Sequence, residues 1–178
     1  MPRLFTALEI PSDVALSLSM LRGGLPGARW IDPENYHVTL RFIGDIDDAL
    51  ASDIAQLLDQ VNRRGFEVRF DGLAPFGGRK PRAVVAAVAP AAPLIELQAE
   101  HERLMQRLGL EPDGRKYIPH VTLARLRDSS SLQVADYLSA RGPFRTAPFS
   151  VSRFVLFSAK AAVGGGPYVV EAAYPLAT

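Results

Sequence analysis

The tetrapeptide His-Val-Thr-Leu occurs twice in this chain, at residues 37–40 and again at residues 120–123. The two copies contain two of the three histidines in the sequence. Each copy alternates polar and apolar residues, which is typical of a β-strand with one face toward a core. His and Thr then share one face, so each copy presents an imidazole and a hydroxyl side by side. Two such strands in equivalent positions are suited to bracket one small anionic group.

A purely structural origin of the repeat has to be weighed, because Val, Thr and Leu are ordinary strand residues. One copy alone would favour that interpretation, but two identical copies favour function. Imidazole titrates near neutral pH, so His37 and His120 are a candidate pair of general acid and base. Thr39 and Thr122 are candidate hydroxyl donors to a phosphate oxygen. The third histidine, His101, falls on the apolar side of an expected helix, and we interpret it as structural.

Composition excludes several other kinds of chemistry. The chain has no cysteine, which rules out disulfides, thiolate catalysis and cysteine-based zinc sites. Two histidines without a clustered carboxylate or a third histidine are a poor metal ligand set. No serine lies beside either histidine in the repeat, so water or a substrate hydroxyl has to be the attacking group. The sequence therefore predicts a site without metal or cofactor.

Length and charge indicate the general class of protein. The chain has 178 residues, of which 48% are hydrophobic, so a single domain can bury a substantial core. The net charge is +1 and the sequence has no basic tail or Lys/Arg block for non-specific nucleic-acid binding, so a nucleic-acid partner would be met at a local site. No signal-peptide pattern and no apolar run near ~18 residues is found. We expect a soluble cytoplasmic monomer with no membrane contact and no obligate protein partner.

Hydrophobic periodicity and turn residues predict an α+β fold. It has two similar lobes that face each other, with mostly antiparallel sheets and with helices on the outer faces, in a single domain over residues 1–178. Ser12, Asp47 or Asp48, and Ser131 are the expected helix N-caps. A loop with Gly164, Gly165 and Gly166 is expected to join the last two strands. The predicted strands are 3–10, 30–31, 36–43, 66–73, 83–89, 119–126, 149–157 and 167–175; the predicted helices are 13–22, 47–64, 93–108 and 131–141.

Regular strand alternation makes specific predictions for the residues that follow the repeats. It orients Arg125 away from the His120 face, so that Arg125 reaches the cleft only if the strand twists or bulges. It orients Arg41 onto the His37 face, where it can neutralise the charge of a phosphate or simply be a surface charge. It orients Phe42 inward, as a core residue.

A further group of residues is suited to contact a nucleotide. Tyr36, Phe76 and Tyr117 are candidates to stack on a base, although packing is an equally good explanation for each. The basic loop 79–82 is a candidate for the cleft entrance, and a solvated loop is the alternative.

The segments around both repeats resemble a known family. Residues 30–44, WIDPENYHVTLRFIG, and residues 119–125, PHVTLAR, are similar to the two motif regions of the two-histidine phosphoesterase superfamily. Within it, the chain resembles the bacterial and archaeal RNA 2′,3′-cyclic phosphodiesterases, which are also called 2′-5′ RNA ligases. The resemblance covers nearly the whole chain and includes the late strand 154–158. A single His-x-Thr-x motif is a weak signal, whereas the pair in these contexts is a strong one.

The resemblance implies a bilobal α+β fold with a central cleft. It also implies hydrolysis of a terminal RNA 2′,3′-cyclic phosphate to a 2′-phosphate, without metal or ATP. It implies that His37 is the proton donor to the leaving 3′ oxygen and that His120 is the proton acceptor from water. Thr39 and Thr122 are implied to bind phosphate oxygens, and Arg125 to contact phosphate charge or an adjacent nucleotide. Run in reverse, the same site joins RNA ends by a 2′-5′ linkage.

Two alternatives to this function stay open at the level of sequence. One is a phosphodiesterase that acts on another cyclic nucleotide, on ADP-ribose cyclic phosphate or on a 2′-5′ oligonucleotide. The other is a non-catalytic protein that binds RNA ends. Loop residues outside the repeats decide the substrate, and the two intact motifs argue against the non-catalytic alternative.

Overall fold

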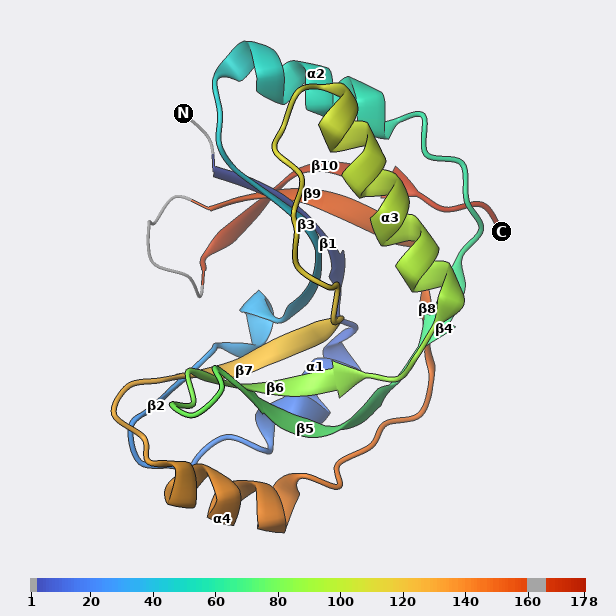
Figure 1. Cartoon of the computed structure of the whole chain (residues 1–178). Helices are drawn as coiled ribbons and strands as arrows, with labels where there is room; N and C mark the ends of the chain where they lie inside the picture. The colour runs from blue at the N-terminus through green and yellow to red at the C-terminus, as the bar shows by residue number, and fades with distance from the viewer. Residues whose placement is uncertain (1–2, 160–165) are drawn as a thin grey trace.

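The computed structural model of the chain describes residues 3–159 and 166–178 (Figure 1). Its strands pair in two four-stranded sheets, of order β10-β9-β1-β3 and β2-β7-β6-β5, and in a short ladder of β4 with β8. The elements are β1 (Arg3–Glu9), α1 (Ser12–Ser19), β2 (Ala28–Trp30), a 3-10 turn η1 (Pro33–Asn35), β3 (His37–Asp45), α2 (Asp48–Leu58), β4 (Phe66–Val68), β5 (Phe70–Phe76), β6 (Ala83–Val88), α3 (Ala92–Arg107), β7 (His120–Leu126), α4 (Ser131–Arg141), β8 (Phe149–Val151), β9 (Arg153–Ala159) and β10 (Tyr168–Pro175).

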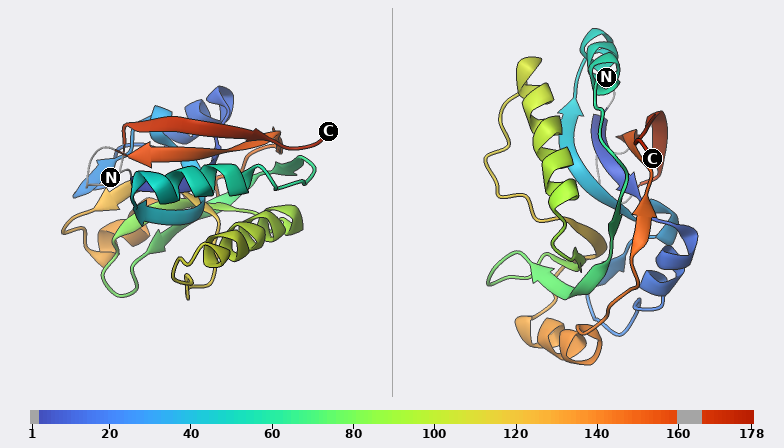
Figure 2. Two further views of the ribbon diagram at one scale, coloured as in Figure 1. Left: turned by 90° about the horizontal axis from the view of Figure 1, so that it is seen from above. Right: turned by 90° about the vertical axis from the view of Figure 1, so that its right-hand side faces the viewer.

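All the strand pairings within the sheets are antiparallel, which confirms the predicted α+β class with antiparallel sheets. Figure 1 shows one sheet above the other, with the two repeats on β3 of the upper sheet and β7 of the lower sheet. The helices lie outside: α2 above the upper sheet, α3 beside β3, and α4 below the lower sheet. In the second view of Figure 2, α3 and α1 lie on opposite sides of the molecule.

Helix starts follow local capping chemistry, with two corrections to the predicted caps. The Asp47 carboxylate accepts a hydrogen bond from the Leu50 backbone N–H at 2.7 Å, as a helix N-cap does. Helix α4 is capped by Ser130, in a capping box with Gln133, so the prediction of Ser131 was wrong by one residue. The prediction of Ser12 was also wrong, because Pro11 occupies the N-cap position of α1 and no side chain caps that helix.

Four predicted elements are shorter or split. Helix α1 ends at Ser19 rather than at residue 22. Helix α2 ends at Leu58 rather than at residue 64. The predicted strand 66–73 is two strands, because β4 pairs with β8 whereas β5 pairs with β6 in the lower sheet. The predicted strand 149–157 divides in the same way into β8 and β9. Of the expected glycine loop, Gly164 and Gly165 lie outside the described residues.

The main hydrophobic core draws on both sheets, with Leu4, Leu8 and Leu40 from the upper sheet and Val121 and Leu123 from the lower one. Because these side chains pack in one cluster, each repeat strand is held from behind while its polar face is turned toward the other sheet. No helix in the described part of the chain is long and apolar enough to cross a membrane.

The third histidine is buried in this core, as its position on the helix predicted. His101 has no exposed surface, and its Nδ1 lies 2.8 Å from the Thr6 hydroxyl. Its ring packs edge-on against Phe154 at 4.5 Å between centroids. Burial lowers the pKa of His101 to about 3, so the ring is neutral at any ordinary pH.

Candidate active site

The first repeat strand contains a β-bulge directly after its threonine. Along the pairing of β3 with β1, Thr39 lies opposite Ala7 and Arg41 lies opposite Thr6, so Leu40 is an extra residue with no partner of its own. An extra residue shifts the strand alternation by one position beyond the bulge. Leu40 and Arg41 are consequently both buried.

The second repeat strand has the same irregularity at the same place. Along the pairing of β7 with β6, Thr122 lies opposite Val85 and Ala124 lies opposite Val84, which leaves Leu123 as the extra residue. Leu123 and Ala124 are both buried, as are their counterparts on β3. The similarity of the two strands therefore includes a local backbone irregularity as well as four residue identities.

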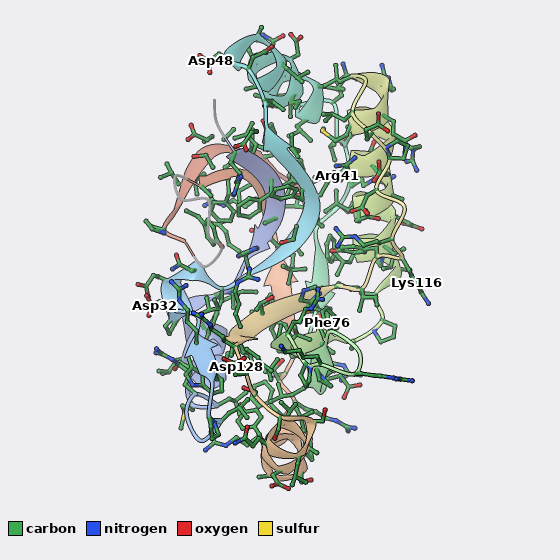
Figure 3. The ribbon with its side chains drawn as sticks, turned by 60° about the vertical axis from the view of Figure 1, so that its left-hand side comes forward. Asp32, Arg41, Asp48, Phe76, Lys116 and Asp128 are labelled. Carbon is green, nitrogen blue, oxygen red and sulfur yellow. The ribbon has the colours of Figure 1, made fainter. Side chains whose placement is uncertain are left out.

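The bulges correct two sequence predictions and decide a third. Arg125 returns to the face of Thr122 and lines the central cavity, as the bulge alternative allowed. Phe42 is not a core residue: its side chain is 49% exposed and lines the same cavity. Arg41 is not on the His37 face: it is 7% exposed and points toward α3, as Figure 3 shows.

The buried Arg41 has a structural partner. Its Nε donates to a Glu102 carboxylate oxygen at 3.0 Å, and one of its terminal nitrogens donates to the Glu111 carbonyl at 2.6 Å. The same carboxylate accepts from the Asp113 backbone N–H at 3.2 Å. This network fixes the loop between α3 and β7. The Tyr117 hydroxyl adds a second anchor by donating to the Thr39 carbonyl at 2.7 Å.

A cavity of about 490 Å³ lies between the two sheets and collects the predicted site residues. All five of them, His37, Thr39, His120, Thr122 and Arg125, are among its lining residues. The structure therefore brings together residues that are more than eighty positions apart in the sequence. Its remaining lining residues are Arg3, Phe5, Ile31, Asn35, Phe42, Phe76, Ala83, Arg115, Ala159 and Tyr168.

Both catalytic candidates are oriented by the same backbone contact. The Nδ1 of His37 lies 2.9 Å from the carbonyl oxygen of Asn35, and the Nδ1 of His120 lies 2.6 Å from that of Ile118. A carbonyl only accepts hydrogen bonds, so Nδ1 must carry the proton in each ring. In each histidine Nε2 is then the atom available to accept or donate a substrate proton.

The two imidazoles have different surroundings. His37 is enclosed by aromatic rings, with Phe5 and Tyr168 centroids at 5.0 and 5.1 Å. Burial lowers the pKa of His37 to about 4, against the raising effect of the Asn35 contact, and the positive charges of His120 and Arg125 lower it further. Burial also lowers the pKa of His120. Both rings are therefore neutral at pH 7 while the cavity is empty.

The remaining aromatic candidates divide between cavity and core. Phe76 lines the cavity and packs edge-on against His120, with ring centroids 4.6 Å apart (Figure 3). Tyr36 is 5% exposed and belongs to the hydrophobic core, so of its two sequence interpretations the structure supports packing and not base stacking. Tyr117 acts as the loop anchor described above and is not a lining residue of the cavity. The basic loop 79–82 does not line it either.

Several lining residues were not predicted. Phe5 and Tyr168 enclose His37 from β1 and β10, and Arg115 reaches the cavity from the loop before β7. Nothing in their local sequence distinguishes them from core or surface residues. Within residues 3–159 and 166–178, no group of three or more His, Asp or Glu side chains comes together in a way that could hold a metal ion.

Comparison with known proteins identifies the family. The family model described as the 2′-5′ RNA ligase superfamily matches residues 13–162. A relative from Aquifex aeolicus, named RNA 2′,3′-cyclic phosphodiesterase, is 30% identical over 150 residues, which cover 80% of this chain and 78% of the relative. A relative of the same name from Aeropyrum pernix is 33% identical over 116 residues; the match covers 64% of this chain and 65%, just under two thirds, of the relative.

Solved structures share the fold over the full length of the chain. The crystal structure of E. coli LigT complexed with 3′-AMP is similar with a TM-score of 0.82 and 24% identity, and the match covers 100% of both chains. A crystal structure described as a phosphoesterase is similar with a TM-score of 0.84 and 21% identity, again over both full chains. The fold is thus that of the LigT-type two-histidine phosphoesterases, and the chain belongs to the 2′-5′ RNA ligase superfamily.

Proposed function

We propose that this protein is a metal-independent RNA 2′,3′-cyclic phosphodiesterase. The observation that carries the proposal is the paired geometry of His37 and His120. Each ring is fixed through Nδ1 on a backbone carbonyl, and each lines a cavity that both motif threonines and Arg125 also line. Relatives that are about 30% identical carry this activity in their names.

In the proposed reaction the cyclic phosphate lies between the two histidines. The Nε2 of His120 takes a proton from water as the water oxygen forms a bond to phosphorus. The bond from phosphorus to the 3′ oxygen breaks, and the Nε2–H of His37 protonates that oxygen. The product carries a 2′-phosphate and a free 3′-hydroxyl. His120 gains one proton and His37 loses one, so no net proton is consumed in the reaction. Proton exchange with solvent then returns both histidines to their starting states.

The threonines and Arg125 stabilise charge on the phosphate. The hydroxyls of Thr39 and Thr122 donate to non-bridging oxygens, on which negative charge develops during attack. The guanidinium of Arg125 supplies a positive charge whose planar array of donors matches phosphate oxygens. Because all three groups are fixed on strands, little reorganisation is needed as the charge moves.

The lowered histidine pKa values impose a condition on this mechanism. A proton donor has to be charged before the reaction, whereas burial keeps His37 neutral in the empty cavity. The phosphate anion supplies the missing stabilisation, because a negative charge at contact distance favours the imidazolium. Binding of the substrate phosphate therefore favours protonation of His37, so the protein takes up a proton from solvent when the substrate binds. The reverse reaction, attack by a 5′-hydroxyl on the cyclic phosphate, uses the same groups and yields a 2′-5′ linkage.

The proposal is tested by measuring turnover of an RNA oligonucleotide that ends in a 2′,3′-cyclic phosphate. We expect His37→Gln and His120→Gln each to lower kcat by roughly 10²–10⁴-fold, the usual contribution of a positioned acid or base. His101→Gln is a matched control, since that histidine is buried away from the cavity. Turnover within a few-fold of wild type in both cavity variants, with the fold intact by circular dichroism, would contradict the proposal.

A further inference from the structure

Two arginines lie directly opposite each other on neighbouring strands of the lower sheet. In the antiparallel pairing of β2 with β7, Arg29 is the partner of Arg125. Residues that are directly opposite share a face of the sheet, with Cβ atoms about 5 Å apart. Arg29 therefore lies next to Arg125 on the same face of the sheet, one strand further from β6. Figure 1 shows that β2 is the edge strand of this sheet.

Strand alternation independently places Arg29 on the cavity side. Ile31, two residues further along the chain, lines the cavity. Trp30, between them, is not a lining residue of the cavity and packs against Tyr137, with ring centroids 5.7 Å apart, whereas Ile31 is buried in the core and also reaches the cavity. Side chains two positions apart point the same way, so Arg29 shares the direction of Ile31. Arg29 is exposed and is not itself a lining residue of the cavity, but it lies opposite Arg125, which is one.

The two positive charges of this pair repel each other, and no carboxylate in the described part of the chain forms an ion pair with either of them. Like charges directly opposite each other destabilise a strand pair. Among residues 3–159 and 166–178, neither Arg29 nor Arg125 forms an ion pair with a carboxylate. The two other arginines that line the cavity differ in this respect, because Arg3 pairs with Asp45 at 3.0 Å and Arg115 with Asp113 at 3.4 Å.

We propose that Arg29, beside Arg125 on the neighbouring strand, provides a second anion site, which binds the phosphodiester on the 5′ side of the terminal nucleotide while Arg125 stays on the terminal phosphate. This inference rests on the proposed function, in which the terminal cyclic phosphate lies at the histidines. Along β7, Thr122 and Arg125 are two regular strand positions apart once the bulge is discounted, or about 7 Å. In RNA, the phosphate nearest to the cyclic one is joined through the 5′ oxygen of the same ribose.

The site would make the enzyme prefer oligonucleotides to single cyclic nucleotides. A cyclic mononucleoside with a 5′-hydroxyl presents only the terminal phosphate and leaves Arg29 without a ligand. A dinucleotide or longer RNA presents a second negative charge that the Arg29 guanidinium can bind. Guanidinium suits this contact because its planar array of donors matches phosphate oxygens.

The first experiment compares two substrates in wild type and Arg29→Ala: adenosine 2′,3′-cyclic phosphate, and the diadenosine dinucleotide that ends in the same cyclic phosphate. We expect the variant to lose about fivefold more kcat/KM on the dinucleotide than on the mononucleoside, as for one exposed charge contact. Its log–log salt slope on the dinucleotide should also fall by about 0.7. Arg103→Ala, which removes an exposed charge from α3, should leave the ratio of the two substrates unchanged.

A binding measurement separates failure of this site from failure of the proposed function. We expect adenosine 3′,5′-bisphosphate to bind wild type more tightly than adenosine 3′-monophosphate, and Arg29→Ala to remove most of that preference. If wild type hydrolyses neither substrate yet shows this Arg29-dependent preference, the anion site stands and the phosphodiesterase proposal falls. An unchanged preference in the variant, or an equal loss of both ligands, would overturn the second site.

Discussion

Binding of a phosphate ligand should raise the pKa of His37 by about three units. Burial keeps this pKa at about 4 in the empty cavity. A unit negative charge 4 Å away contributes about 4 kcal/mol at the effective dielectric constant of such sites, and 1.36 kcal/mol corresponds to one pKa unit. The pKa of His37 in the complex is then roughly 7. At pH 7 the ring changes from almost fully neutral to about half protonated.

The assay is NMR titration of the histidine Cε1–H resonances, with and without adenosine 3′-monophosphate. In the free protein, His37 should stay neutral down to pH 5. In the complex it should titrate near pH 7. Calorimetry at pH 7 in two buffers of different ionisation enthalpy gives the number of protons taken up, which we expect to be at least about half a proton larger in wild type than in His37→Gln.

Two results would refute this reasoning. If His37 remains neutral at pH 6 with the ligand bound, it does not act as the proton donor, and the roles of His37 and His120 are reversed. If His37→Gln takes up as many protons as wild type, the charge forms elsewhere. The ligand's own phosphate contributes little at pH 7, because its second pKa is near 6 and it binds mostly as the dianion.

The other predictions concern metal dependence and stability. Turnover should be unchanged in EDTA, and recovery of a lost rate on adding a divalent cation would contradict the metal-independent mechanism. Glu102→Ala should lower the free energy of unfolding by about 3 kcal/mol, because it leaves the buried guanidinium of Arg41 without its carboxylate, whereas Asp71→Ala at an exposed pair should cost under about 1 kcal/mol in the same urea titration. The free energy of unfolding should fall as pH drops from 6.5 toward 4, because His37 and His101 take up protons in the unfolded chain but not in the folded one. Each of these two histidines should lower the free energy of unfolding by about 2 kcal/mol at pH 5. Equal unfolding midpoints at pH 7 and pH 5 would refute this.

Periodicity predicted the larger part of the fold because most elements have a clean pattern and a clear stop. The limits of β7 and α4 follow from alternation and from turn residues that local sequence contains. The division of residues 66–73 into β4 and β5 does not, because it depends on which distant strand each half pairs with. Which strands pair is set by tertiary structure, and the strand propensity of the local sequence does not predict it.

The candidate site shows the same division between local and tertiary information. The histidines and threonines were identifiable because the chain repeats them. The positions of Arg41, Phe42 and Arg125 were not, because the bulges at Leu40 and Leu123 reverse the alternation on which side-chain direction was judged. A bulge that contains no glycine has little sequence signature. Both bulges directly follow the threonine of the repeated tetrapeptide, so a bulge known in one copy predicts a bulge in the other.

The proposed activity is best tested by mapping the product of an RNA oligonucleotide with a terminal 2′,3′-cyclic phosphate, incubated with the protein in EDTA. We expect a 2′-phosphate and a free 3′-hydroxyl, because His37 protonates the 3′ oxygen. A 3′-phosphate would show that the attack and leaving positions are reversed. An unchanged cyclic phosphate would contradict the assignment of this activity to the cavity.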